Sequence, residues 1–237
     1  MFFFMKRNKN ILIWGGGLRS QNIINKIKNT KYFINNKLSI KYIFDNSLKT
    51  LRFKTNINFL NKLSELKKII KDCSFFIVAI GSEHGKARYL ISKKLIKNNL
   101  KPLNNISNHA LIDSTVIFGE GFQAEDGSIV NCNAKIGDFC IVNTNATVDH
   151  HTEIGHGCHV MPGATILGNI KIGNFVTIGA NATILPHLNI GDGSFIGAGS
   201  VVTKNIKKNE IVKGNPAKKI RSNSHKIDLS PFKKKFS

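Results

Sequence analysis

The stretch ATVDHHTEIGHGCHVMPGATILGNIKIGNF, residues 146–175, decides the fold because an apolar residue recurs in it at every sixth position. The same register runs without a gap from Ala110 to Asn205, which makes 16 hexads. A period of six fits neither an α-helix nor an alternating strand, but it fits short strands joined by tight turns. Three hexads make one triangular coil, so residues 18 positions apart stack. The repeat therefore predicts a parallel β-helix whose third hexad positions point inward.

The residues before the repeat show strand-like apolar runs that alternate with helical periodicity. We expect strands over 11–14, 40–44 and 74–81, and helices from Leu18 to Ile27, over 59–71 and over 86–97. This order predicts a small parallel sheet of the Rossmann type.

A glycine turn follows the first expected strand, at Gly15, Gly16 and Gly17. Such a turn can hold phosphate on its backbone N–H groups, and Asp45, at the end of the second strand, could meet a ribose hydroxyl. The alternative is a plain strand-to-helix turn, because Ser20 replaces the last glycine of the G-x-G-x-x-G motif.

The net charge of +21 raises the question of a nucleic-acid partner, but the charge is unevenly placed. Residues 110–205 carry three lysines and eight acids, so the excess lies outside the repeat. Basic and aromatic residues are not interleaved as in RNA-binding domains. We therefore expect solvated lysines and no nucleic-acid partner, with a nucleic-acid binder as an alternative.

The apolar runs are too short to span a membrane, and the opening MFFFMKRNKN lacks the order of a signal peptide. We expect no membrane span and a cytoplasmic protein. The four cysteines form no C-x-x-C pair, so we expect reduced thiols and no metal site.

Several motifs resemble a family of acyltransferases. They are Val148-Asp149-His150 followed by His159, then VAIGSEHGKARYL (78–90), NNISNHALIDST (104–115) and IVKGNPAKKI (211–220). The chain resembles the hexapeptide-repeat acyltransferases and, among them, the sialic-acid O-acetyltransferases (NeuD-like) and nucleotide-amino-sugar N-acetyltransferases (PglD-like).

The resemblance implies an α/β Rossmann-like domain followed by an all-β left-handed parallel β-helix. Its domains would be a sugar- or nucleotide-binding domain over 1–108, the β-helix over 109–206 and a basic tail over 207–237. It also implies a homotrimer with acetyl-CoA bound between subunits and a sugar or nucleotide sugar held by the first domain.

By the same resemblance His150 is the general base, His159 lies near the acyl carbonyl, and Gly168 contacts the thioester arm. An attacking amine or hydroxyl must lose a proton, and imidazole suits that work near neutral pH. The substrate would be held by the glycine turn and Asp45. The chain departs from the family at the shortened glycine run and at His151, where the family usually has an acid.

The sequence thus predicts an acetyl-CoA-dependent acetyltransferase acting on an amino or hydroxyl group of a bacterial sugar. A nucleotide-linked 4-amino sugar for surface glycans is the favoured acceptor, and a sialic-acid-type O-acetyltransferase is the alternative. Two other classes stay open: a non-catalytic β-helix scaffold and a γ-carbonic-anhydrase-like zinc enzyme. For zinc, His151 and His187 have a fitting spacing, but Asp192 stands where the third histidine should be.

Overall fold

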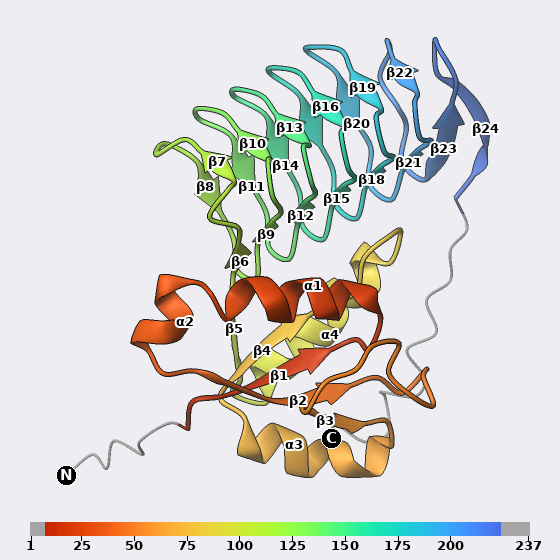
Figure 1. Ribbon diagram of the computed structural model, residues 1–237. Helices are drawn as coiled ribbons and strands as arrows, with labels where there is room; N and C mark the ends of the chain where they lie inside the picture. Colours follow the sequence, from red (N-terminus) through yellow and green to blue (C-terminus); the bar gives the residue numbers. More distant parts are fainter. Residues whose placement is uncertain (1–7, 224–237) are drawn as a thin grey trace. The chain divides into compact units, whose positions relative to one another are not determined.

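The protein is described by a computed structural model that covers residues 8–223 of the 237. The apolar N-terminal extension and the last part of the expected basic tail, residues 224–237, lie outside the described residues. The described chain packs as two units (Figure 1). Residues 8–80 and 90–103 form the first, and residues 81–89 and 104–223 form the second.

The first unit is built on a parallel sheet of five strands in the order β3-β2-β1-β4-β5. Its strands are β1 (Asn10–Trp14), β2 (Ser39–Phe44), β3 (Asn58–Leu60), β4 (Phe75–Val78) and β5 (Lys101–Pro102). Its helices are α1 (Leu18–Ile27), α2 (Lys31–Asn35), a 3₁₀ turn (Leu63–Glu65) and α3 (Leu66–Asp72), and α4 (Gly85–Lys97) passes from the second unit into the first. The strand order reverses at β1, as in doubly wound sheets.

The strands and helices expected in this unit are confirmed, except for the helix over 59–71. That prediction is wrong in its first half, because Asn58–Leu60 pairs in parallel with Tyr42–Phe44 of β2. The helix begins only at Leu66. A short apolar run at Phe59 and Leu60 suits a strand or a helix, and pairing with an existing sheet edge decides between them.

The second unit is a coil of three sheets that extends through the whole predicted repeat, and its strand pairs are parallel except the last, Glu210–Lys213 with Lys218–Ser222 (Figure 1). The six-stranded sheet holds β7 (Leu111–Ile112), β10 (Ile129–Val130), β13 (Thr147–Val148), β16 (Thr165–Ile166), β19 (Thr183–Ile184) and β22 (Val201–Val202). The five-stranded sheet holds β8 (Ile117–Phe118), β11 (Lys135–Ile136), β14 (Glu153–Ile154), β17 (Lys171–Ile172) and β20 (Asn189–Ile190). The eight-stranded sheet holds β6 (Asn105–Ile106), β9 (Gln123–Ala124), β12 (Ile141–Val142), β15 (His159–Val160), β18 (Thr177–Ile178), β21 (Phe195–Ile196), β23 (Glu210–Lys213) and β24 (Lys218–Ser222).

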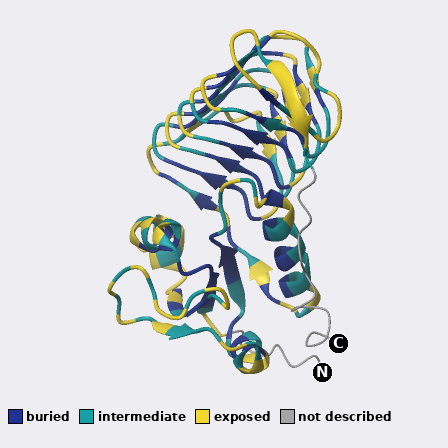
Figure 2. Cartoon of the chain, turned by 90° about the vertical axis from the view of Figure 1, so that its right-hand side faces the viewer, coloured by how far each residue is buried: buried dark blue, intermediate teal, exposed yellow. Residues whose placement is uncertain are grey.

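Each coil pairs with the next at a shift of 18 residues, as the repeat predicts. Thr147 stands opposite Thr165, for example, and Val148 opposite Ile166. The third hexad positions fill the interior, where Val148 and Ile166 are completely buried. Figure 2 shows buried residues following the strands of the coils and exposed residues gathered at turns. The coil begins one hexad earlier than the predicted repeat, with β6 paired to β9.

The turns between strands place the sixth hexad position in the left-handed region of backbone space. From position 121 to position 199 every sixth residue has a φ between 54° and 68°, whether it is Gly, Asn, Phe or His. Glycine recurs at the fourth hexad position, directly after the inward aliphatic residue, for a different reason. A Cβ at Gly155 would lie 2.7 Å from the carbonyl carbon of Gly173 in the next coil, so stacking excludes a side chain there.

Candidate active site

The candidate base lies on the turn that leads from β13 of the six-stranded sheet to β14 of the five-stranded sheet. His150 occupies the fifth hexad position of this turn, and its side chain is 45% exposed. The next residue, His151, has a φ of 56°, and its N–H donates to the carbonyl oxygen of Cys132 in the preceding coil. The turn geometry therefore holds two adjacent imidazoles at one corner of the coil.

The two rings interact directly. Nδ1 of His150 lies 3.2 Å from Nδ1 of His151, and the rings meet edge to face. Nε2 of His151 lies 3.5 Å from Nδ2 of Asn133, which occupies the same turn position one coil earlier. His150 is therefore anchored at Nδ1, while its Nε2 is the ring nitrogen that remains for an external group.

A carboxylate stands on the Nε2 side of His150. One oxygen of Asp149 lies 3.9 Å from Nε2. The other accepts hydrogen bonds of 2.8 Å from Nδ2 of Asn131 and from the backbone N–H of His150. These two bonds, above all the one from Asn131, hold the pKa of Asp149 below its usual range. The site therefore keeps a negative charge that would stabilise a protonated His150.

The structure brings two of the predicted site residues, Gly168 and His150, together. The two residues occupy the same turn position in successive coils. A Cβ at Gly168 would lie 2.5 Å from Cε1 and 2.6 Å from Nε2 of the His150 ring. Glycine is needed here because any side chain would displace the imidazole.

His159 lies in a different setting, on β15 of the eight-stranded sheet, and is only 4% exposed. Its Nδ1 lies 3.1 Å from the carbonyl oxygen of Ser82, which can only accept, so Nδ1 carries the proton. Its Nε2 lies 3.1 Å from Nδ2 of Asn143, whose oxygen already accepts from the N–H of Thr144. Nε2 therefore accepts from the amide of Asn143.

Residues 81–89, which lie within the motif at 78–90, cover this part of the coil. Its Arg88 is fully buried and donates to the carbonyl oxygens of Phe139, Gly157 and Cys158 at 2.8–3.1 Å. Tyr89 packs its ring against those of Phe139 and Phe175, at 5.8 and 5.5 Å between centroids. These contacts seat Ser82 beside His159.

In the first unit the structure brings the glycine turn and Asp45 together. The N–H of Gly16 donates to a carboxylate oxygen of Asp45 at 2.8 Å, and the N–H of Gly15 donates to the carbonyl of Phe44. The other oxygen of Asp45 accepts from the N–H and the hydroxyl of Ser47. Two of the three amides expected to hold phosphate therefore already have acceptors.

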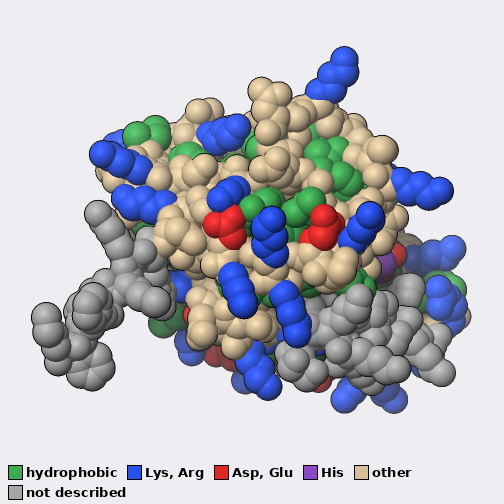
Figure 3. Space-filling view, turned by 90° about the horizontal axis from the view of Figure 1, so that it is seen from below, with side chains coloured by type: hydrophobic (Ala, Val, Ile, Leu, Met, Phe, Trp, Pro, Cys, Tyr) green, Lys and Arg blue, Asp and Glu red, His purple; other side chains and the backbone are tan. Residues whose placement is uncertain are grey.

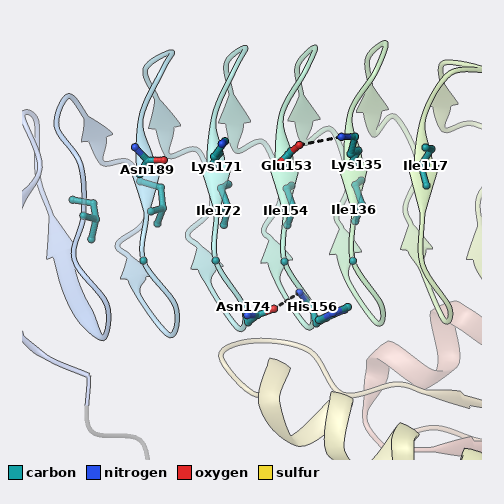
Figure 4. A pocket seen from close by; sticks show the side chains of 16 residues that line it. Ile117, Lys135, Ile136, Glu153, Ile154, His156, Lys171, Ile172, Asn174 and Asn189 are labelled. Carbon is teal, nitrogen blue, oxygen red and sulfur yellow. Dashed lines mark hydrogen bonds and ion pairs between the residues drawn. The ribbon is translucent and has the colours of Figure 1, made fainter.

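An open groove of about 650 Å³ runs along the outer face of the five-stranded sheet. Figure 4 shows Lys135, Glu153 and Lys171 along one side of it, with Lys135 and Glu153 joined by an ion pair of 3.1 Å. The fourth-position glycines and the edges of buried isoleucines such as Ile154 contribute to its lining. The groove is therefore apolar in the middle and charged along that side.

Within 8–223, no group of three or more His, Cys, Asp or Glu side chains is arranged to hold a metal ion, so His151, His187 and Asp192 form no such group. No helix in this part of the chain is long and apolar enough to cross a membrane.

The repeat and the fold define the class of the protein. The family described as bacterial transferase hexapeptide (six repeats) matches residues 133–168, 151–186 and 169–204. This match and the structural matches given below together confirm the expected class. It is a hexapeptide-repeat acyltransferase with a Rossmann-like domain before a left-handed β-helix. No curated protein sequence matches the chain.

The chain is similar to solved sugar acetyltransferases over nearly its whole length. PerB from Caulobacter crescentus, solved with CoA and GDP-perosamine, is 25% identical, with a TM-score of 0.76 over 90% of this chain and 97% of that chain. A variant of the same organism's perosamine N-acetyltransferase matches equally well. WeeI from Acinetobacter baumannii is 26% identical, with a TM-score of 0.77 over 89% of this chain and 99% of that chain. The acetyltransferase domain of PglB from Neisseria gonorrhoeae, 24% identical, shares the fold, with a TM-score of 0.77 over 90% of this chain and all of that domain. The predicted resemblance to the NeuD/PglD-like sugar acetyltransferases is therefore confirmed.

Proposed function

We propose that the protein transfers the acetyl group of acetyl-CoA to the amine of a nucleotide-linked 4-amino sugar. The observation that carries this proposal is the match, over 90% of the chain, to an enzyme solved with CoA and GDP-perosamine. That relative is named as an N-acetyltransferase, which favours an amine over a hydroxyl as acceptor. We place the reaction in the cytoplasm.

In the proposed reaction His150 is the general base. The acceptor nitrogen attacks the thioester carbonyl, the new C–N bond forms, and Nε2 of His150 takes the proton that the nitrogen loses. The C–S bond then breaks, and the same proton passes to the departing sulfur of CoA. The ionised Asp149, 3.9 Å from Nε2, stabilises the imidazolium between these steps.

We assign the acyl-CoA contacts to Gly168 and His159. Gly168 is suited to the thioester arm because it adjoins the ring of the base. His159 would approach the acyl carbonyl, and one of its ring nitrogens would then exchange its bond to Ser82 or Asn143 for the ligand.

We assign the sugar nucleotide to the first unit, at the glycine turn and Asp45. A carboxylate has about four lone-pair sites, and Gly16 and Ser47 use three of those of Asp45, which leaves capacity for a ribose hydroxyl. The described residues of this unit carry 18 Lys and Arg against three acids. Figure 3 shows Lys and Arg side chains outnumbering acidic ones on one face of the molecule. Such a field draws in anionic substrates.

We also propose that the active form is a homotrimer. The outer face of the six-stranded sheet presents Leu111, Ile129, Val201 and a column of threonines, and Leu111 is 66% exposed. Exposed apolar side chains on a face of this kind are typical of subunit contacts. Light scattering of the purified protein tests the trimer.

The test of the function is thiol release from acetyl-CoA with a panel of acceptors. The panel contains UDP- and GDP-linked amino sugars, the matching sugars with a hydroxyl in place of the amine, and free sialic acid. We expect turnover with one amino sugar, and its loss in His150→Ala but not in His187→Asn, which changes another exposed turn histidine. Turnover with a hydroxyl acceptor alone would favour the O-acetyltransferase. An absence of both turnover and CoA binding would favour the alternative of a non-catalytic β-helix scaffold.

A further inference from the structure

We propose that His151 is a positioning residue that fixes the tautomer of His150. In this proposal a hydrogen-bonded chain runs from His150 through His151 to Asn133 and leaves Nε2 of His150 unprotonated. The catalytic consequence rests on the proposed function, but the tautomer is a property of the unliganded protein.

The geometry allows two arrangements of protons. Two ring nitrogens 3.2 Å apart form a hydrogen bond only if one carries a proton and the other a lone pair. In the first arrangement His150 donates from Nδ1 to Nδ1 of His151, and His151 donates from Nε2 to the amide oxygen of Asn133. In the second arrangement Nδ1 of His151 donates to Nδ1 of His150, and the amide nitrogen of Asn133 donates to Nε2 of His151. The structure places Nδ2 of Asn133 against Nε2 of His151, as in the second arrangement, and a half-turn of the amide about its last bond gives the first.

Only the first arrangement gives a base at the exposed edge of the ring. It leaves a lone pair on Nε2 of His150, the ring nitrogen that lies 3.9 Å from a carboxylate oxygen of Asp149 and on the side of Gly168. In the second, Nε2 carries a proton and the lone pair on Nδ1 is used by His151. A proton taken up at Nε2 in the first arrangement turns the ring into an imidazolium, which the carboxylate of Asp149 attracts.

The site therefore divides two tasks between two neighbours of His150. Asp149 supplies the negative charge, and its pKa is held low by Asn131 and the N–H of His150. His151 supplies the hydrogen-bond acceptor at Nδ1 without adding a second negative charge to the same turn. A carboxylate at position 151 would place two like charges on opposite sides of one ring.

The backbone of the turn decides which variants test this role. His151 has a φ of 56°, a conformation that suits Gly and Asn far better than Ala. The chain itself uses Asn or Gly at equivalent positions, such as Asn133, Asn169 and Gly157. His151→Gly therefore removes the acceptor without straining the turn. His151→Asn keeps an acceptor, because Oδ1 of Asn branches from the side chain at the same point as Nδ1 of His.

The first experiment is steady-state kinetics with the acceptor that the panel of sugars selects. We expect His151→Gly to lower kcat by about 10- to 100-fold, part of the roughly 10²–10⁴ that a general base contributes, with KM for acetyl-CoA unchanged. His151→Asn should stay within about threefold of the wild type. The matched control is His187→Gly, which changes a histidine of φ 61° at the same turn position two coils further on. It should have wild-type activity.

The second experiment reads the tautomer directly by ¹⁵N–¹H correlation NMR of the imidazole rings at neutral pH. We expect His150 to carry its proton on Nδ1 in the wild type and in His151→Asn, and to give a mixture of tautomers in His151→Gly. A wild-type His150 protonated on Nε2, or full activity in His151→Gly, would overturn the proposal. If no acceptor is turned over, the proposed function fails, while the NMR result still decides the tautomer.

Discussion

Gly168 leaves the space that the imidazole of His150 fills. The two residues stack at the same turn position, and a Cβ on Gly168 would come within 2.5 Å of the ring. The coil that contains Gly168 thus helps to set the position of the His150 imidazole in the preceding coil.

This relationship predicts the effect of Gly168→Ala. The added methyl group should push His150 away from Asp149 and His151, and kcat should fall by at least about tenfold because the base is misplaced. His150 is half-exposed, so the thermal unfolding temperature should change little. Kinetics and calorimetry on the same preparation check both parts. Unchanged kcat would show that the observed position of His150 is not the reactive one.

Arg88→Met should destabilise the second unit. The fully buried guanidinium donates hydrogen bonds to the carbonyl oxygens of Phe139, Gly157 and Cys158. Methionine would leave these acceptors without that donor. We expect a loss of roughly 2–4 kcal/mol in the free energy of unfolding, with a fall in Tm of several degrees. The control is Lys86→Met, an exposed residue of the same helix. Equal Tm values for the two variants would contradict the structural role of Arg88.

The four cysteines should differ sharply in reactivity. Cys73, Cys140 and Cys158 are buried, whereas Cys132 is partly exposed. Burial raises the pKa of Cys73 to about 12 and also raises the pKa of Cys158, which suppresses the reactive thiolate.

Alkylation with iodoacetamide at pH 8, followed by peptide mass spectrometry, should therefore label Cys132 first. Cys132 occupies the turn position of His150 one coil earlier, so its labelling should also stop turnover. Cys132→Ser should resist this inactivation. Inactivation of that variant at the wild-type rate would locate the sensitive thiol elsewhere.

Acid should destabilise the first unit through Asp72. Its carboxylate accepts from Nζ of Lys41 at 2.7 Å and from the hydroxyl of Tyr42 at 2.6 Å. These bonds, that of Lys41 first, hold the pKa of Asp72 below its usual range. A depressed folded-state pKa contributes stability that is present above the unfolded-state value and is lost as pH falls through the folded one.

The stability difference between the wild type and Asp72→Asn should therefore be constant near neutral pH and shrink below pH of about 4. Urea unfolding across this range measures it. A difference that does not change with pH would show that the ion pair is not formed in solution.

Much of the second unit could be predicted from the sequence because its order is local and repeated. The hexad register fixed which residues point inward, so Val148 and Ile166 were assigned to the core correctly. The left-handed turn position is visible in the sequence as a recurrence of Gly or Asn every six residues, but the reason for the fourth-position glycines is not. Their role depends on the distance between coils, which no single hexad shows.

The rest of the site depends on contacts between residues far apart in the chain. Arg88 reaches Phe139 across 51 positions, and no periodicity marks that pairing. The strand at Asn58–Leu60 depends likewise on the free edge of β2, which the local sequence does not reveal. His150 and Gly168 were predicted from the family resemblance, and their stacking at one corner of the coil follows from the 18 residues between them.

The most direct test of the central claim is a single-turnover reaction of acetyl-CoA with the GDP- or UDP-linked amino sugar selected by the panel. Mass spectrometry follows the acetylated nucleotide sugar in the wild type and in His150→Ala. We predict one acetyl group on the amine, formed at least about 100-fold more slowly in the variant, which still binds CoA. Equal rates in the two proteins would contradict the assignment of His150 as the base, and an absence of acetylated product in the wild type would contradict the proposed reaction.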